Sequence, residues 1–335
     1  MIRSIRTAAA ALLLAACAAS AQAPVKILRV GLVANTVPLD EWRSPRRADG
    51  SPHAGELIRQ GLRERGWVDG KNVRILHRSA EGRLEGLPAI FEELAALPVD
   101  VIVAIGPGAV AAAKATKTVP IVMSATAAAV DIGLASSLAR PGGNLTGLSF
   151  EARDEIIAKR LELLKRALPQ LSKVAFLTHG PPGASWDRMY QAAATQAGVN
   201  IVRAEFADLA DLERAFASAE RDGAQAVLVV DGVSVHQSDY QRAINAAASR
   251  RRLPTLHSAE GGADTGGLMS YAIDSRAQYR RIPYFVDRIL RGAKPSDLPM
   301  EQPGNPELVV NRGVAKAFGL VLPLSLVLQA NRVIE

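Results

Sequence analysis

The residues that could bind a small molecule are polar residues placed directly after short apolar segments. In the first half of the chain, these candidate ligand-binding residues are Asn35, Thr36, Gly106, Gly108, Ser124 and Thr126. In the second half, they are His179, Asp231, Ser234 and Glu260. Their amide, hydroxyl, imidazole and carboxylate groups, together with the open backbone of the two glycines, can hydrogen-bond to a polar solute.

Gly106-Pro107-Gly108 is the segment among them that suits an anion. It separates an apolar run from an alanine-rich helical segment, and backbone amides at the start of a helix attract groups such as a carboxylate. A plain tight turn is the alternative interpretation. The segment does not have the Gly-x-x-x-x-Gly-Lys-Ser/Thr pattern of a P-loop, and no Gly-x-Gly-x-x-Gly follows the first apolar run.

Other candidates also have a structural alternative. His179 could contact a ligand or pair with loop backbone. Asp231 could accept a hydrogen bond from a ligand amine or cap the next turn. Glu260 could be a solvated loop carboxylate, because two glycines follow it. Trp42 could stack on a ligand or anchor its own loop.

The sequence lacks the patterns of common catalytic and metal sites. It has no Gly-x-Ser-x-Gly and no His-Glu-x-x-His segment. The five histidines are scattered without metal-ligand spacing: His53, His77, His179, His236 and His257. Cysteine chemistry is excluded from the fold because Cys17, the one cysteine, lies in the N-terminal leader. We therefore expect no catalytic residue, no metal and no cofactor.

The elements that must position the candidates alternate between strand and helix. Apolar runs predict strands over residues 27–34, 72–77, 99–105 and 119–123, and again over 173–178, 200–204 and 226–230. Segments with helical spacing separate them, including one predicted over 131–139. Strands that are apolar throughout and followed by helices indicate parallel sheets covered on both faces. Two such series predict an α/β fold of two doubly wound lobes.

The C-terminal region predicts how the lobes are joined. An amphipathic helix over 276–291, a Pro- and Gly-rich loop, a strand over 307–311 and a helix over 314–318 are too little for a third domain. They are enough to complete both lobes by crossing between them, which makes a multi-strand hinge. We expect lobe 1 over residues 24–147 and about 272–300, and lobe 2 over 148–271 and about 301–335.

The first residues read as a signal peptide over 1–23. Arg3 and Arg6 precede an uncharged apolar run over 7–16, and Ala19-Ser20-Ala21 forms a cleavage site. The run is too short for a permanent membrane span, so we expect the mature chain in the periplasm. Leu14-Ala15-Ala16-Cys17 also matches a lipobox, so Cys17 is either a lipidation site or a small apolar residue of the leader.

The charge of the chain indicates no nucleic-acid partner. The net charge is +7, but the basic residues are dispersed and no aromatic residues alternate with them. Small clusters such as 250–252 fit solvated helix faces. We expect a monomer whose contact with a membrane is limited to the lipid on Cys17, if that residue is acylated.

Several motifs resemble one known family. They are GLRERGWVDGKN over residues 61–72, AEGRL over 80–84, ASSLARPGGNLTGLS over 135–149, GGLMSY over 266–271 and GAKPSDLP over 292–299. This series, which spans nearly the whole mature chain in order, resembles the ABC transporter substrate-binding proteins of the tryptophan/tyrosine type. The resemblance implies a type I periplasmic-binding fold, and an ABC permease as partner.

We expect a small polar solute, amino-acid-like or a carboxylate, to bind in the cleft between the lobes, and the resemblance does not fix which one. Family members usually carry Thr or Ser with Pro where this chain has Gly106-Pro107-Gly108. They often carry Gly-Asp-Pro where it has Ala127-Ala128-Ala129, so a natural partner for an α-amino group is missing. A periplasmic sensor with the same clamp, or an enzyme on this scaffold, are the alternatives.

Overall fold

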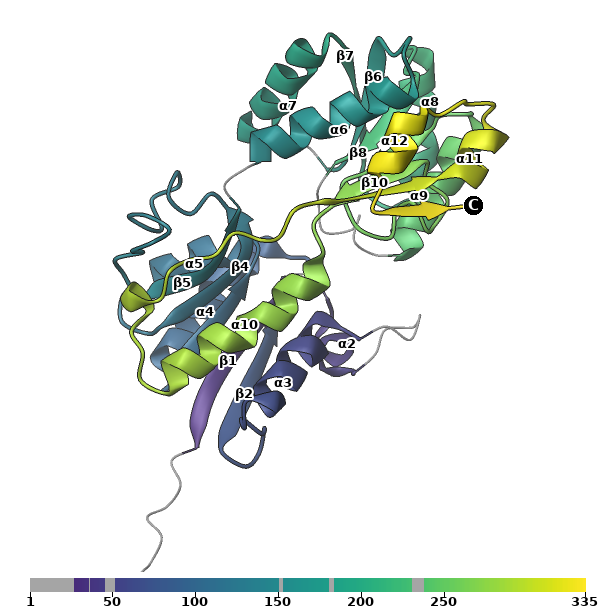
Figure 1. Ribbon diagram of the computed structural model, residues 1–335. Coiled ribbons are helices and arrows are strands. Elements are labelled where there is room, and N and C mark those ends of the chain that lie inside the picture. The colour runs from purple at the N-terminus through teal and green to yellow at the C-terminus, as the bar shows by residue number, and fades with distance from the viewer. Residues whose placement is uncertain (1–26, 36, 46–51, 151–152, 181–183, 231–237) are drawn as a thin grey trace, which may run out of the picture.

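Two α/β lobes, each built on its own sheet, make up the molecule (Figure 1). The structure is a computed structural model that describes residues 27–35, 37–45, 52–150, 153–180, 184–230 and 238–335. We name the lobes by their sheets, the five-stranded lobe and the seven-stranded lobe.

The five-stranded lobe holds a fully parallel sheet with the strand order β2-β1-β3-β4-β5. Its strands are β1 (Leu28–Ala34), β2 (Val73–Ser79), β3 (Val101–Ile105), β4 (Ile121–Ala127) and β5 (Leu145–Phe150). Its helices are α2 (Leu39–Arg43), α3 (Ala54–Glu64), α4 (Leu87–Ala96), α5 (Gly108–Ala115) and α10 (Ser275–Leu290), with 3₁₀ turns η1 (Leu84–Gly86) and η4 (Pro295–Asp297).

The central strands β1 and β3 are almost entirely apolar because helices cover both faces of the sheet. Along β1, Leu32 packs in a cluster with residues of α3 and α10, whereas Val33 packs in a second cluster with residues of α4 and α5. Both side chains are fully buried. Alternation along the strand therefore supplies two separate cores.

The seven-stranded lobe has the order β12-β11-β10-β9-β8-β6-β7. Its strands are β6 (Lys173–His179), β7 (Asn200–Phe206), β8 (Ala226–Val229), β9 (Thr255–His257), β10 (Met269–Ala272), β11 (Glu307–Asn311) and β12 (Arg332–Ile334). Its helices are α6 (Arg153–Ala167), α7 (Ala184–Ala197), α8 (Leu212–Arg221), α9 (Ser238–Arg250), α11 (Arg312–Ala317) and α12 (Leu324–Gln329), with the 3₁₀ turn η2 (Leu209–Asp211).

This second sheet is mixed rather than fully parallel. Strand β11 pairs antiparallel with β10, while the other pairings in the sheet are parallel. The reason is connectivity, because β11 enters the lobe from the crossing segment at the edge where β10 leaves it. The predicted α/β fold class with two doubly wound lobes is confirmed, with this one reversal.

Three segments of the chain run between the lobes. They connect β5 to α6, β10 to α10, and η4 to β11. The third runs beside the end of β5, where the first begins, because Ser149 of β5 donates its backbone N–H to the carbonyl of Glu301 at 2.9 Å, and Glu301 donates its N–H to the carbonyl of Gly147 at 2.9 Å. Since β5 and β10 are both left at their carboxyl ends, the carboxyl edges of the two sheets lie at the hinge.

One predicted helix is wrong, and three elements were not predicted, namely helices α2 and α12 and strand β12. Residues 131–139 form turns rather than a helix, because Gly133 takes a φ of +72° and the chain folds back so that Leu134 donates its N–H to the carbonyl of Ala129 at 2.8 Å. Helix α12 and strand β12 complete the seven-stranded lobe beyond the predicted helix over 314–318. No helix in the described part of the chain is long and apolar enough to cross a membrane.

Candidate functional site

Asn35 and Gly106 come together at the carboxyl edge of the five-stranded sheet. The side-chain amide of Asn35 follows β1 and donates to the carbonyl of Ile105, at the end of β3, at 2.6 Å. The Gly106 N–H donates to the Ser124 carbonyl in β4 at 2.7 Å. The ends of β1, β3 and β4, which lie far apart in the sequence, thereby form one polar edge of the sheet.

The Gly106-Pro107-Gly108 segment fits tightly against Asn35. Gly106 has a φ of +54°, and a Cβ atom there would lie 3.0 Å from the Asn35 Nδ2 atom. A Cβ at Gly108 would lie 3.3 Å from Asn35 Oδ1 and 3.2 Å from the Phe91 ring. Helix α5 starts at Gly108 without a side-chain cap. Because the first turn of a helix has amides without helical partners, an anion can be bound at this end.

Two polar atoms at this edge are buried without a hydrogen-bond partner among the described residues. They are the Asn35 Oδ1 atom and the Ser124 hydroxyl, and Ser124 is fully buried. A buried polar atom that lacks a partner costs free energy, so such atoms are candidates for completing their bonds with a bound solute. The backbone of Thr126 lies in β4 at the same edge.

His179 lies at the end of β6, on the seven-stranded lobe, and is held by its own loop. Its Nε2 atom lies 2.7 Å from the carbonyl of Ala207, and its ring stacks on Phe206 with the ring centroids 5.1 Å apart. The side chain is exposed. Of the two interpretations predicted for His179, the observed contacts are those of a loop residue with a backbone partner.

Glu260 connects the loop after β9 to the start of α10. Its carboxylate accepts a hydrogen bond from the Ser275 hydroxyl at 2.7 Å, and its carbonyl accepts one from the Gln241 amide at 2.8 Å. Ser275 is the first residue of α10, directly after a crossing segment. Glu260 thus ties a strand-end loop to the hinge, and it is not a freely solvated carboxylate.

The structure adds a further candidate site residue, Arg160, which the sequence patterns did not indicate. Arg160, from α6, is 4% exposed and donates to the carbonyls of Tyr271 at 3.0 Å and Ser258 at 3.1 Å. It therefore joins the end of β10 to the loop after β9. The Ser258 hydroxyl is buried without a partner. Nothing in the helical spacing around Arg160 separates it from surface arginines, so only the fold could find it.

Four predicted residues lie outside the described part of the chain, and Trp42 lies in a core of the five-stranded lobe. Thr36, Asp231, Ser234 and Cys17 lie outside the described residues. Trp42 is 3% exposed and packs in the core against Gly55, where a Cβ atom would lie 3.4 Å from the indole ring. Of its two interpretations, the structure supports the one in which Trp42 anchors its own loop.

Two buried histidines are neutral parts of the lobe cores. Burial lowers the pKa of His257, which is fully buried, to about 3. Burial, with the nearby guanidinium groups of Arg59 and Arg43, lowers the pKa of His77 to about 4. The described residues hold no group of three or more His, Cys, Asp and Glu side chains that could bind a metal ion.

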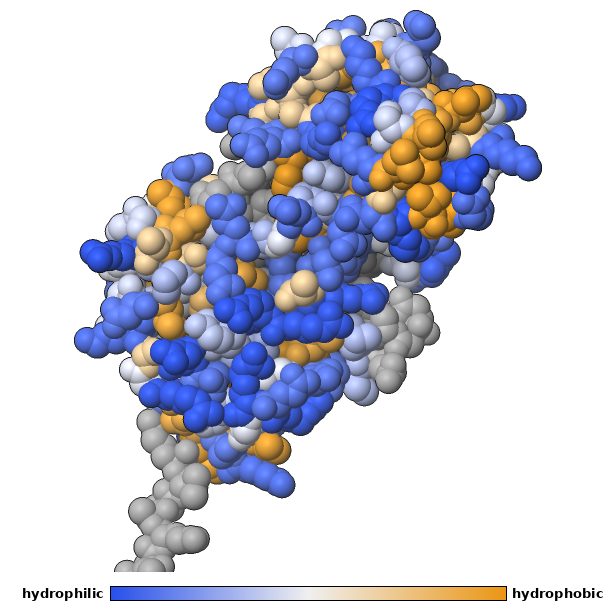
Figure 2. All heavy atoms as spheres, in the orientation of Figure 1, coloured by the Kyte–Doolittle hydropathy of each residue, from blue (hydrophilic) through white to orange (hydrophobic). Residues whose placement is uncertain are grey.

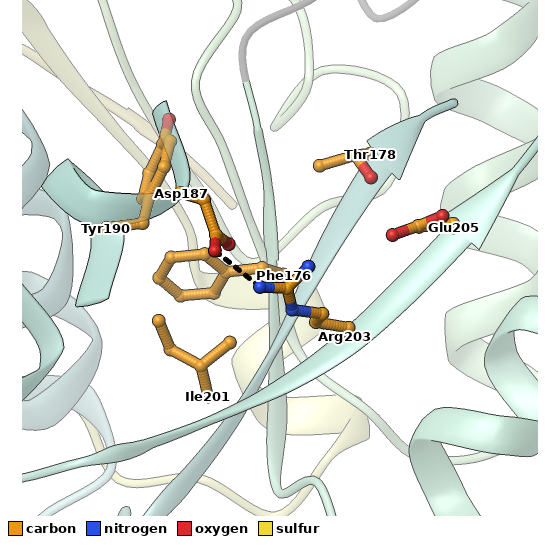
Figure 3. Close-up of a pocket in the computed structure, with 7 residues that line it drawn as sticks. All are labelled: Phe176, Thr178, Asp187, Tyr190, Ile201, Arg203 and Glu205. Atoms are coloured by element: carbon orange, nitrogen blue, oxygen red, sulfur yellow. Dashed lines mark hydrogen bonds and ion pairs between the residues drawn. The ribbon is translucent and has the colours of Figure 1, made fainter. Parts of the chain in front are cut away.

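A small pocket lies on the seven-stranded lobe between α7 and the strands β6 and β7 (Figure 3). Asp187 and Arg203 form an ion pair of 2.5 Å across it, and Phe176 and Tyr190 line it. Its volume of about 20 Å³ holds little more than one water molecule. It is too small for a solute of the size of an amino acid.

Two α/β lobes that the chain joins three times define the architecture of periplasmic-binding proteins. The chain belongs to the ABC transporter substrate-binding protein family, whose pattern matches residues 49–334. The resemblance inferred from the sequence motifs is thus confirmed. Members of this family bind substrates rather than transform them, and they normally act outside the cytoplasm.

Individual proteins and solved structures are also similar to this chain. A tyrosine-binding protein from Clostridioides difficile is 26% identical over 265 residues, which cover 78% of this chain and 75% of the relative. The crystal structure of a conserved domain protein from Vibrio cholerae covers 92% of this chain and all of its own, with a TM-score of 0.76 and 24% identity. A domain from Streptococcus pneumoniae in complex with L-Trp has the same coverage, a TM-score of 0.75 and 23% identity.

Proposed function

We propose that this chain is the extracytoplasmic solute-binding component of an ABC importer. The solute would bind in a cleft between the two lobes, over the carboxyl edges of both sheets, and closure of the lobes would enclose it. The single observation that carries this proposal is the convergence of both carboxyl edges on one hinge, since parallel α/β sheets bind ligands at that edge. The family assignment supports the role in transport.

The proposed ligand is a small polar molecule with a carboxylate, and amino acids are the first class to test. The uncapped start of α5 beside Asn35 offers amide donors to a carboxylate. The tyrosine-binding relative and the L-Trp complex of the pneumococcal domain both concern aromatic amino acids. Because residues 127–129 are all alanine, the partner of an α-amino group would have to lie elsewhere.

The proposed location is the periplasm, after removal of a signal peptide over residues 1–23. If Cys17 is acylated, a lipid would anchor the chain to the membrane surface. The closed form would then dock on an ABC permease and release its solute there.

Thermal unfolding with a matched set of ligands tests the proposed binding. L-Tyrosine carries both charged groups, 3-(4-hydroxyphenyl)propionate lacks the amine, and tyramine lacks the carboxylate. We expect the first two to raise the melting temperature and tyramine to have no effect. A ligand at a hundredfold excess over its Kd stabilises the folded state by about 2.7 kcal/mol. Stabilisation by tyramine alone would contradict the assignment of a carboxylate site.

A charge substitution locates the site. Asn35→Asp keeps the size of the side chain but places a negative charge beside the start of α5. We expect it to weaken binding of the best carboxylate ligand at least tenfold, which is about 1.4 kcal/mol. Asn200→Asp, at the exposed start of β7 and the opposite end of its lobe, is the control. Equal affinities of the two variants would exclude the α5 start as the ligand site.

A further inference from the structure

The positive charge of the chain is concentrated in its five-stranded lobe. Residues 24–150 and 273–301, which include this lobe, hold 21 Lys and Arg residues and 16 Asp and Glu residues, so their net charge is +5. Residues 151–272 and 302–335, which include the seven-stranded lobe, hold 17 of each kind and have no net charge. Such a difference in charge between two parts of one chain indicates that the basic part faces an anionic partner.

The excess charge lies on α10 and the turn that follows it. Residues 275–294 hold one acidic residue, Asp287, and six basic residues, which are Arg276, Arg280, Arg281, Arg288, Arg291 and Lys294. At 3.6 residues per turn, Arg276, Arg280 and Arg288 fall within about 120° around the helix axis, and all three are exposed. We call these three residues the α10 stripe. It extends over roughly 18 Å, because each residue adds about 1.5 Å along a helix.

The cations of the α10 stripe are not neutralised by neighbouring carboxylates. Their three guanidinium groups have no hydrogen bond or ion pair with another described residue. Asp287, the one acidic residue within α10, has other partners, because it accepts from the Arg291 guanidinium at 2.7 Å and from the Trp67 indole at 2.8 Å. Glu301 likewise pairs with Arg281. The stripe therefore presents free positive charge to solvent.

Helix α10 is a fixed part of the lobe, so the stripe is held on the surface. On the side opposite to the stripe, Ile282, Phe285 and Val286 are buried in the core. Asp274 caps the start of the helix by accepting from backbone N–H groups of its first turn at 2.8 and 3.1 Å. Figure 1 shows α10 on the outside of the five-stranded lobe beside α3, and the surface over these helices is mostly blue in Figure 2. Because its apolar side is used in the core, α10 can contact a bilayer only through headgroups.

We propose that the α10 stripe binds the headgroups of anionic phospholipids at a membrane surface. The inference rests on the proposed extracytoplasmic role, which places the chain beside a membrane. A guanidinium group donates paired hydrogen bonds to phosphate oxygens, and the stripe offers three such groups on one side of a helix. Each basic residue near an anionic bilayer strengthens binding about fivefold. This contact goes beyond the lipid on Cys17, to which the sequence limited the expected membrane contact.

The side chains around the stripe favour a lipid surface over a protein partner. Protein interfaces depend on aromatic and apolar anchor residues near their centre. Among the described residues, no exposed large apolar side chain lies on α10 or on α3. The Tyr284 ring, between the arginines of the stripe, has the Arg281 guanidinium over it at 3.9 Å from the ring centroid. Free cations without an apolar anchor suit contact with headgroups.

The start of the fold supports the same orientation. Leu28, the first residue of β1, belongs to the five-stranded lobe and is eleven positions after Cys17. Eleven residues span at most about 40 Å, so a lipid on Cys17 would keep this lobe near the bilayer. Helix α10 covers a face of the sheet, whereas the solute is proposed to bind at its carboxyl edge, so the two contacts are compatible.

Co-sedimentation with vesicles tests the membrane contact. The protein is residues 24–335, because the apolar leader would itself bind lipid and its removal takes no described residue away. We expect binding to mixed vesicles of phosphatidylglycerol and phosphatidylcholine at about 50 mM salt, and its loss at about 0.5 M salt, where charges are screened within a few Å. Arg276→Gln/Arg280→Gln/Arg288→Gln should lower the partition coefficient about a hundredfold.

A matched variant removes the same number of charges from the other lobe. Arg188→Gln/Arg221→Gln/Lys316→Gln changes three exposed residues of the seven-stranded lobe that have no ion pair with another described residue. We expect it to bind the mixed vesicles within about threefold of the parent chain. Equal losses in the two variants, or equal binding to vesicles of phosphatidylcholine alone, would overturn the inference. So would a chain that does not bind vesicles but binds poly-L-glutamate, which would indicate an acidic protein as the partner.

Melting temperatures separate this inference from the proposed solute binding. All six substituted side chains are exposed, so both variants should keep the circular dichroism of the parent chain and its ligand-induced rise in melting temperature. The vesicle assay contains no solute. Loss of vesicle binding by the parent chain with an intact ligand response would therefore refute the membrane contact alone, and the reverse result would refute the solute proposal alone.

Discussion

His257 makes the stability of the seven-stranded lobe depend on pH in a way that can be worked out from its contacts. Its Nε2 atom lies 2.8 Å from the Asn245 Oδ1 atom, and that oxygen also accepts from the Thr255 hydroxyl at 2.8 Å. The Nε2 atom is therefore the donor of a neutral ring. The Nδ1 atom is buried without a partner, so a proton there would place an unpaired charge in the core.

The sign and size of the effect follow from the two pKa values. Burial lowers the pKa of His257 to about 3 in the folded state, whereas the unfolded value is about 6.5. As the pH falls below about 6.5, the unfolded state takes up a proton that the folded state does not bind. The contribution of the neutral His257 to the free energy of unfolding is therefore fully present above that pH and is lost as the pH falls toward 3. Between pH 7.5 and pH 5, His257 alone lowers the free energy of unfolding by about 2 kcal/mol.

Urea unfolding at pH 7.5, 6 and 5 measures this loss. The wild-type chain is compared with His257→Gln, which keeps an N–H donor near Asn245 but does not titrate. We expect the variant to be less stable at pH 7.5 but to lose about 2 kcal/mol less than the wild type on acidification. His77 is present in both proteins, so its contribution cancels. If both proteins lose the same free energy between pH 7.5 and pH 5, the reasoning about His257 is refuted.

Three further predictions concern stability. Trp67→Phe removes the indole N–H that donates to Asp287 at 2.8 Å and should lower the free energy of unfolding by about 1 kcal/mol; an unchanged urea midpoint would contradict this. Gly147→Ala should prevent native folding, as judged by soluble yield and circular dichroism, because φ is +127° and the new Cβ would lie 2.1 Å from a backbone oxygen of β4. Leu326→Ala removes a fully buried side chain and should cost about 2–5 kcal/mol, whereas Leu328→Ala, on the exposed side of the same helix, should change the thermal midpoint little.

The alternation of elements could be predicted from the sequence because it depends on local patterns. The apolar run predicted over 27–34 corresponds to β1 (Leu28–Ala34), and the run over 99–105 corresponds to β3 (Val101–Ile105). Residues 131–139 show the limit of such patterns. Their apolar spacing is helical, but the left-handed Gly133 turns the chain back, and the sequence alone does not specify that conformation.

The candidate site could be located but not assembled from the sequence. Strand ends correctly indicated that Asn35 and Gly106 share an edge, since carboxyl ends of parallel strands align. The bond from Asn35 to Ile105 spans 70 residues, and no local pattern specifies it. Arg160 was missed for the same reason, because its partners Ser258 and Tyr271 lie about 100 residues away.

The contacts around Glu301 restrict how one lobe can move against the other. The third connecting segment is hydrogen-bonded there to Gly147 and Ser149 of β5, and Arg281 of α10 donates to the Glu301 carboxylate at 2.7 and 2.5 Å. These partners all belong to the five-stranded lobe, so the third segment is held to that lobe as far as Glu301. If the lobes open and close as proposed, the third segment should therefore bend after Glu301, on its way to β11.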